Sequence, residues 1–206
     1  MRRKTKAVVF DLYGTLIRIR NDKKAFQRLF RELACERIHG TKNARKIAFT
    51  RDATTLSELA HIINPNHAVD VKKYEIEICE ELKRAECFPE TIKVLERLKE
   101  EEFPTGLISN LCIPYQIPFF SLGLSDLIDH HIFSYEIGLE KPDPEIYLKM
   151  LEKLGLDAKQ VWMIGDSHHC DVKGPQSVGM NAILLDRALT TAGSVSSLEG
   201  IFQFLD

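Results

Sequence analysis

Short apolar runs recur along the chain, and their spacing constrains the fold more than any other feature of the sequence. Each run holds only three to five residues. Runs of this kind are typical of strands that are buried on both faces of a parallel sheet. The five predicted strands are Ala7–Phe10, Thr105–Ser109, Ile132–Ser134, Val161–Ile164 and Ala182–Leu185.

Helical patterns lie between these runs. Thr91–Glu101 and Glu145–Leu154 both carry apolar residues at helical spacing. The second helix is well delimited, because Asp143 suits the N-cap, Pro144 the first helical position and Gly155 the left-handed stop. Strands that alternate with helices predict a parallel sheet with right-handed crossovers. We therefore predict an α/β fold with a Rossmann-like core built on five parallel strands.

The alternation is interrupted once, by a long helical stretch over residues 21–85. Roughly 65 helical residues are too many for one crossover, so they predict an inserted subdomain. We predict a catalytic core of residues 1–17 and 88–206 and an all-helical cap of residues 18–87. The helical signals are Phe26, Leu29, Phe30, Leu33 and Ala34, a capping box from Thr55 to Glu58, and Val71, Tyr74, Ile78 and Leu82.

The charge of the chain is nearly balanced, with 28 Lys and Arg against 30 Asp and Glu. Such a chain has no global field to gather nucleic acid or an anionic membrane, so we expect neither partner. Residues 103–125 are uncharged but contain prolines and amides, and we interpret them as a buried strand followed by a loop. Residues 17–63 are locally basic, with eleven Lys and Arg, among them Arg18, Arg20, Arg45 and Arg51, against five Asp and Glu. This favours a small anionic substrate.

The five cysteines are scattered, odd in number and form no CxxC pair, which favours reduced thiols in the cytoplasm. The basic start, MRRKTK, is followed by only four apolar residues, too few for the apolar part of a signal peptide. The sequence HHCD at 168–171 contains metal-ligand residue types. Adjacent residues on one turn point in different directions, so we do not expect zinc there. The sequence does not specify an oligomeric state.

Polar residues follow the predicted strands at their carboxyl ends, which is the edge where open parallel sheets bind their ligands. Three carboxylates at this edge repel one another unless a hard divalent cation such as Mg²⁺ lies among them. With a lysine, a hydroxyl and an amide nearby, the site would hold a dianionic group against a carboxylate nucleophile, as covalent phosphoryl transfer requires. The residues are Asp11, Ser109, Asn110, Lys141, Asp166 and Asp171.

Each of these residues also has an ordinary explanation as part of a turn or a helix cap. That explanation accounts for one strand end at a time, and not for four successive ends. Through four motifs the sequence resembles the haloacid dehalogenase superfamily of hydrolases, and the helical insert lies where members with a small helical (C1-type) cap carry theirs. The motifs are DLYGTL at 11–16, ISN at 108–110, EKPDPEIY at 140–147 and GDSHHCDVKGPQSVGM at 165–180.

The resemblance implies a role for each of these residues. Asp11 would be the nucleophile, Mg²⁺ would be the cofactor, and Tyr13 would offer its backbone carbonyl to the metal. The implied sets are Asp11, Tyr13, Ser109 and Lys141 for catalysis; Thr15, Ser109, Asn110 and Lys141 for substrate binding; and Asp11, Tyr13, Asp166 and Asp171 for the metal.

Tyr13 departs from the pattern of the family's phosphatases, which carry a second Asp there as general acid and base. DxYGT is instead similar to the haloacid dehalogenases proper, which form an alkyl ester on the Asp and need no metal. A phosphatase without the second Asp loses a proton transfer worth about 10² to 10⁴ in rate. A dehalogenase with Asp166 would hold an uncompensated carboxylate beside its nucleophile and its carboxylate substrate. The second cost is the larger, so phosphoryl chemistry is favoured.

Three functions remain open from the sequence. The first is a Mg²⁺-dependent hydrolase of a small phosphorylated metabolite, a phosphomonoesterase that acts through an aspartyl-phosphate on Asp11. The second is a metal-independent 2-haloacid dehalogenase that uses the same aspartate. The third is a low-activity binding protein on the same scaffold, against which the retention of Asp11, Lys141 and Asp166 argues.

Overall fold

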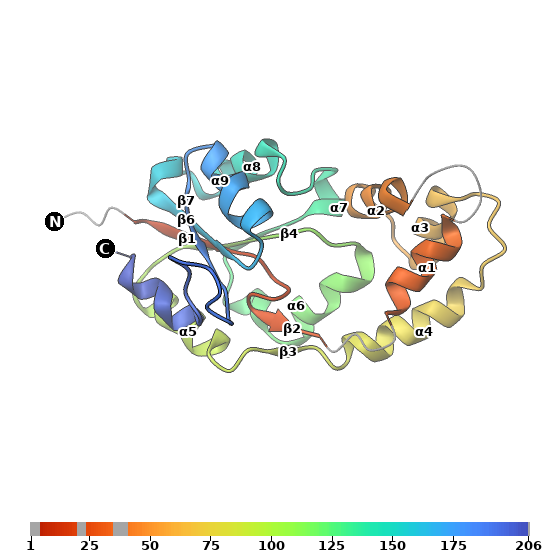
Figure 1. The fold of residues 1–206 in the computed structure, drawn as a ribbon, viewed down its shortest axis with the longest axis horizontal. Coiled ribbons are helices and arrows are strands. Elements are labelled where there is room, and N and C mark those ends of the chain that lie inside the picture. Colours follow the sequence, from red (N-terminus) through yellow and green to blue (C-terminus); the bar gives the residue numbers. More distant parts are fainter. Residues whose placement is uncertain (1–4, 20–23, 35–40, 206) are drawn as a thin grey trace.

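The computed structural model describes residues 5–19, 24–34 and 41–205 (Figure 1). Its centre is a five-stranded sheet in which all strand pairs are parallel. The order is β5-β4-β1-β6-β7, so the first strand of the chain lies in the middle. The predicted α/β fold is confirmed. The strands are β1 (Ala7–Phe10), β4 (Thr105–Ser109), β5 (His130–Phe133), β6 (Val161–Gly165) and β7 (Asn181–Leu184).

Helices connect these strands. α8 begins at Pro144 and ends at Leu154, the Asp143 carboxylate accepts a hydrogen bond from the Glu145 N–H, and Gly155 is left-handed, as predicted. The helices outside the insert are α5 (Thr91–Glu100), α6 (Ile117–Ser121), α7 (Ser134–Ile137), α8 (Pro144–Leu154) and α9 (Gly174–Ser177). Short 3₁₀ helices span Ile113–Gln116, Leu124–Asp126, Ala158–Gln160 and Leu198–Gln203, and a π-helical turn spans His168–Lys173.

β1 is buried on both faces, as its uninterrupted apolar sequence predicts. Val8 and Phe10 belong to a hydrophobic cluster that includes side chains of α5. Ala7 and Val9 alternate with them and belong to a second cluster, which includes side chains of α8. Helices therefore cover both faces of the sheet and leave its carboxyl edge for the loops.

The helical insert, residues 19–85, lies between two short strands, β2 (Ile17–Arg18) and β3 (Glu86–Cys87), which pair antiparallel. No pattern in the sequence predicts these two-residue strands. The insert has its own hydrophobic cluster, and in Figure 1 its helices gather at one end of the molecule. They are α1 (Ala25–Leu33), α2 (Thr41–Thr50), α3 (Leu56–Ile63) and α4 (Val71–Leu82).

The segment after β4 differs from the predicted loop. It contains a 3₁₀ helix and α6, and Pro114 and Pro118 lie in their first turns. Proline is tolerated there because the first N–H groups of a helix have no intrahelical partner. Both prolines therefore lie at helix starts instead of in a loop.

Two other predictions are wrong in detail. β5 runs from His130 to Phe133 rather than over 132–134, because an edge strand tolerates polar, half-buried histidines. The Thr55 hydroxyl caps α3 by accepting from the Glu58 N–H, but the Glu58 carboxylate accepts from the N–H and hydroxyl of Thr54. The reciprocal half of the capping box is therefore shifted by one residue.

None of the helices in the described ranges combines the length and the apolar character that crossing a membrane requires. Cys79, Cys87, Cys112 and Cys170 are free thiols. Cys35, Arg20 and the first four residues of the chain lie outside the described residues.

The order of the strands also places the site. The chain leaves β1 for β4 and β5 on one side and later continues into β6 and β7 on the other, so the strand order reverses at β1. Open α/β sheets bind ligands outside the carboxyl ends of the strands at such a point. Asp11 directly follows β1 and Asp166 directly follows β6.

Candidate active site

Three carboxylates converge at the carboxyl edge of the sheet: Asp11 after β1, and Asp166 and Asp171 after β6. Oxygen atoms from all three lie within 4.8 Å of one another, and they form the only such group of His, Cys, Asp and Glu side chains in the described part of the chain. Asp11 and Asp171 are 8% and 1% exposed, whereas Asp166 is exposed. We call these three residues, together with Lys141, the acidic cluster.

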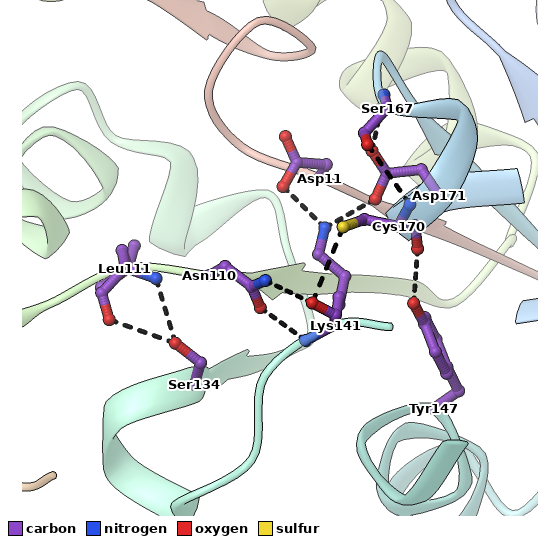
Figure 2. Close-up of polar contacts among 9 residues, drawn as sticks. All are labelled: Asp11, Asn110, Leu111, Ser134, Lys141, Tyr147, Ser167, Cys170 and Asp171. Atoms are coloured by element: carbon purple, nitrogen blue, oxygen red, sulfur yellow. Dashed lines mark hydrogen bonds and ion pairs between the residues drawn. The ribbon is translucent and has the colours of Figure 1, made fainter. Parts of the chain in front are cut away.

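Lys141 lies between two of the carboxylates. Its Nζ is 2.7 Å from Oδ1 of Asp11 and 2.7 Å from Oδ1 of Asp171 (Figure 2). Burial alone would lower the pKa of this ammonium group, but the two carboxylates raise it above its usual value. Lys141 therefore remains charged, and it holds Asp11 and Asp171 in a fixed arrangement.

The carboxylates themselves are not fully compensated. Burial raises the pKa of Asp11 to about 7, with Asp171 and Asp166 adding to the rise and Lys141 opposing it. Burial and the charge of Asp171 also raise the pKa of Asp166. Burial is the largest cause of both shifts and the neighbouring carboxylates add to them, so a cation bound at this edge would favour the charged forms.

Asn110 positions Lys141. The Asn110 Nδ2 donates to the carbonyl of Lys141, and its Oδ1 accepts from the Lys141 N–H, both at 2.7 Å. Figure 2 shows this paired contact between Asn110 and the backbone at the base of the lysine side chain. The amide that the sequence suggested for substrate binding is thus engaged with the backbone of the neighbouring segment.

Tyr13 points away from the carboxylates. Its hydroxyl donates to the backbone carbonyl of Tyr115 at 2.7 Å, and the two rings meet edge to face with centroids 5.9 Å apart. Burial raises the pKa of the Tyr13 hydroxyl further above its already high value. Tyr13 is therefore a neutral hydrogen-bond donor whose proton is engaged.

Ser109 and Thr15 are both buried near the acidic cluster. Ser109 ends β4, the neighbour of β1, and is 2% exposed. Thr15 is fully buried, and its hydroxyl has no hydrogen-bond partner among the described residues, while its carbonyl accepts from Arg187 at 3.0 Å. The structure thus places all eight sequence-predicted residues at or beside this edge, although Asn110 and Tyr13 direct their polar groups elsewhere.

Two glycines allow the carboxylates to approach the backbone. A Cβ on Gly14, whose φ is +87°, would lie 2.1 Å from Oδ2 of Asp166. A Cβ on Gly165 would lie 2.3 Å from Cγ of Asp171. A pocket of about 470 Å³, lined by residues that include Gly14, Asp166 and His168, opens beside the cluster.

Sequence reasoning missed three supporting residues. The Tyr147 hydroxyl donates to the Cys170 carbonyl, and the Cys170 thiol lies 3.6 Å from the Lys141 carbonyl (Figure 2). Arg187 pairs with Glu90 at 2.7 Å and thereby anchors the loop that contains Thr15. Tyr147 and Cys170 lie within the quoted motifs, but nothing in the sequence pointed to Arg187. In HHCD, only Asp171 joins the acidic cluster.

The fold and the site define a Rossmann-like α/β protein with a lysine-bridged acidic cluster at the sheet's carboxyl edge. A model of the haloacid dehalogenase-like hydrolases matches residues 5–179, and the chain belongs to this family.

Curated relatives and solved structures share parts of the sequence and the fold. A glyceraldehyde 3-phosphate phosphatase of Methanothermobacter thermautotrophicus is 33% identical over 106 residues, 51% of this chain and 47% of the relative. A phosphoglycolate phosphatase of Yersinia pestis is 33% identical over 100 residues, 48% of this chain and 43% of the relative. The chain therefore matches about half the length of these relatives.

Among solved structures, a phosphatase of Thermococcus onnurineus has a TM-score of 0.69 at 22% identity and covers 97% of both chains. A 2-haloacid dehalogenase of Pseudomonas syringae has a TM-score of 0.68 at 20% identity, with the same coverage. At these identities the likeness concerns the fold, which phosphatases and dehalogenases share.

Proposed function

We propose that this chain is a Mg²⁺-dependent phosphomonoesterase whose nucleophile is Asp11. The observation that carries the proposal is the third carboxylate, Asp166. It adjoins Asp11 and Asp171, but it takes part in no ion pair within the described residues. The curated relatives named as phosphatases support the same chemistry.

The acidic cluster fits a magnesium ion. Mg²⁺ prefers hard oxygen ligands and is usually bound by one or two carboxylates together with water and substrate phosphate. Asp11 and Asp166 would hold it, with the Tyr13 carbonyl and, directly or through water, Asp171. When bound, the ion would neutralise charge on the phosphate and draw it toward the nucleophile.

Residues of the chain would carry out the nucleophilic attack and stabilise the transferring group. A carboxylate oxygen of Asp11 forms a bond to phosphorus, and the bond between phosphorus and the ester oxygen breaks, so that the alcohol leaves with the bonding electron pair. Lys141 and Ser109 would stabilise the charge on the transferring phosphoryl group. Water then attacks the aspartyl-phosphate, which releases inorganic phosphate and restores the carboxylate.

Protonation of the leaving group is the step for which this site has no evident acid. Tyr13 occupies the position of the missing acid, but its proton is engaged by the Tyr115 carbonyl and burial raises its pKa. The alcohol would therefore take its proton from solvent. This enzyme would favour esters of acidic alcohols and would be slow with simple alkyl phosphates.

We further propose that residues 18–87 act as a cap over the core formed by 1–17 and 88–206. The separate hydrophobic cluster of the insert supports this division, and Tyr115 packs against both that cluster and a core cluster. A cap that closes over the cluster would exclude water from the first step. The free thiols support a reducing compartment, the cytoplasm, as the location.

A metal-independent 2-haloacid dehalogenase is the second candidate, and Tyr13 is the observation that favours it. The position of Asp166 argues against it, because no lysine or arginine in the described ranges pairs with that carboxylate. A haloacid substrate would add another carboxylate to this excess of negative charge.

The test is phosphate release from glyceraldehyde 3-phosphate, phosphoglycolate and an aryl phosphate, with Mg²⁺ and with chelator. We expect turnover that requires the metal and is fastest for the aryl ester. Halide release from chloroacetate in the presence of chelator, without any phosphate release, would replace the proposal with the second candidate.

A further inference from the structure

A pocket of about 570 Å³ lies in the helical insert, outside the acidic cluster. Among the described residues, those that line it belong to α1 and α2, and we call it the α1–α2 pocket. Its volume is within the range of small-molecule sites. Its lining consists of Phe26, Gln27, Phe30, Arg31, Arg45 and Phe49.

The two arginines of this pocket are not neutralised. Arg31 and Arg45 are exposed, and neither forms an ion pair or hydrogen bond with another described residue. By contrast, Arg28, which also lies on α1, pairs with Glu77 at 2.7 Å, and Arg18 of β2 pairs with Glu86 at 2.9 Å. Two unpaired guanidinium groups on one pocket favour an anion, which each can bind through several N–H donors.

The rest of the lining is aromatic. The rings of Phe26 and Phe30 lie 4.3 Å apart, and the guanidinium of Arg45 lies 5.1 Å from the centre of the Phe49 ring. Such a surface buries an apolar body and stacks with a flat one. The pocket therefore combines an apolar surface with a positive rim.

A row of packed rings runs from the pocket to the loop that follows β1. Phe26, which lines it, meets the ring of Tyr115 edge to face at 5.0 Å. Tyr115 in turn meets Tyr13 at 5.9 Å, and Tyr13 is two residues from Asp11. A ligand in the pocket would thus lie on the side of the nucleophile loop that Tyr13 occupies.

From this arrangement we infer that the α1–α2 pocket binds the leaving-group part of the substrate, and that preferred substrates carry an aromatic or similarly apolar body with a second anionic group. This inference rests on the proposed function. It sets the chain apart from the substrates for which its relatives are named, glyceraldehyde 3-phosphate and phosphoglycolate, which have no apolar body.

A binding experiment tests the pocket without catalysis. Calorimetric titration would compare 1-naphthoate with the uncharged 1-naphthamide, using the wild-type protein and the double variant Arg31→Met with Arg45→Met. We expect the double variant to weaken naphthoate by about tenfold, as for loss of a charge-assisted hydrogen bond, and to leave naphthamide unchanged. The control is Lys46→Met. Lys46 is an exposed residue of α2, as Arg45 is, but it does not line the pocket, so this variant should leave the affinities for naphthoate and naphthamide unchanged.

A kinetic experiment then tests the role of the pocket. Benzyl phosphate and 4-carboxybenzyl phosphate have similar leaving groups, so their kcat/KM ratio reports recognition of the second anion. We expect the carboxylated ester to be preferred by about tenfold in the wild type and the preference to vanish in the double variant.

The outcomes separate the two proposals. Equal binding of naphthoate and naphthamide, or a double variant that binds naphthoate like the wild type, would overturn the pocket assignment. Naphthoate binding that depends on the arginines, without hydrolysis of any phosphate ester, would overturn the phosphatase and the leaving-group role but keep the anion site. Hydrolysis without preference for the carboxylated ester would overturn the substrate class alone.

Discussion

The acidic cluster and the α1–α2 pocket use positive charge in opposite ways. In the cluster, Lys141 is 4% exposed and contacts two carboxylates at 2.7 Å. In the pocket, Arg31 and Arg45 are exposed and have no carboxylate partner among the described residues. A buried, compensated charge is fixed before substrate arrives, whereas an exposed, unpaired one is available to it. We therefore propose that the sheet edge carries out the chemistry and that the insert recognises the substrate.

The largest expected effect comes from removing the nucleophile. Asp11→Asn should reduce turnover of any phosphomonoester by roughly 10⁴-fold or more, because an amide cannot attack phosphorus. Steady-state phosphate release measures this, with circular dichroism to check the fold. A variant that retains a tenth of wild-type activity would remove Asp11 from the mechanism.

Lys141→Met should affect both chemistry and stability. It leaves Asp11 and Asp171 buried together without their shared cation, and breaking a buried ion pair costs about 3–5 kcal/mol. Urea unfolding measures the loss of free energy. The control is Lys149→Met, whose exposed pair with Glu152 contributes at most about 1 kcal/mol. Equal stability of the two variants would contradict the account of the cluster.

Asp166→Asn should remove the response to metal. A ligand that binds only the folded state stabilises it by RT ln(1 + [L]/Kd), about 2.7 kcal/mol at a hundred times Kd. Thermal unfolding with and without Mg²⁺ should therefore show a shift in the wild type and none in this variant. The control is Glu96→Gln, an exposed carboxylate on α5, which should keep the shift. A shift that survives in Asp166→Asn would exclude this carboxylate as a ligand.

The smallest effect is expected at Tyr13. Tyr13→Phe removes one hydrogen bond to Tyr115, so it should cost about 1 kcal/mol of stability and change turnover little. Tyr13→Asp should raise turnover of alkyl phosphates by up to about 10²-fold, because it supplies the missing acid. Comparing kcat for alkyl and aryl phosphates in both variants checks this. If Tyr13→Phe loses alkyl phosphatase activity and Tyr13→Asp gains none, Tyr13 is itself the acid.

The sequence predicts the part of the molecule that depends on local pattern. Short apolar runs identify the five strands, and parallel topology then brings the residues after β1 and β6 to one edge. Side-chain orientation was not predictable, because it depends on distant partners. Tyr13 donates to a carbonyl 102 residues away, and Asn110 contacts Lys141 across 31 residues. The α1–α2 pocket is likewise formed by residues of two separate helices, so no single sequence motif predicts it.

The central claim is that Asp11 carries the phosphoryl group during turnover. The direct test is mass spectrometry of acid-quenched peptides after mixing the enzyme with an aryl phosphate and Mg²⁺. The account predicts one phosphoryl group on the peptide that contains Asp11, which is absent in Asp11→Asn and disappears once substrate is exhausted. Turnover with an unmodified Asp11 peptide and a phosphoryl group on another residue would contradict it.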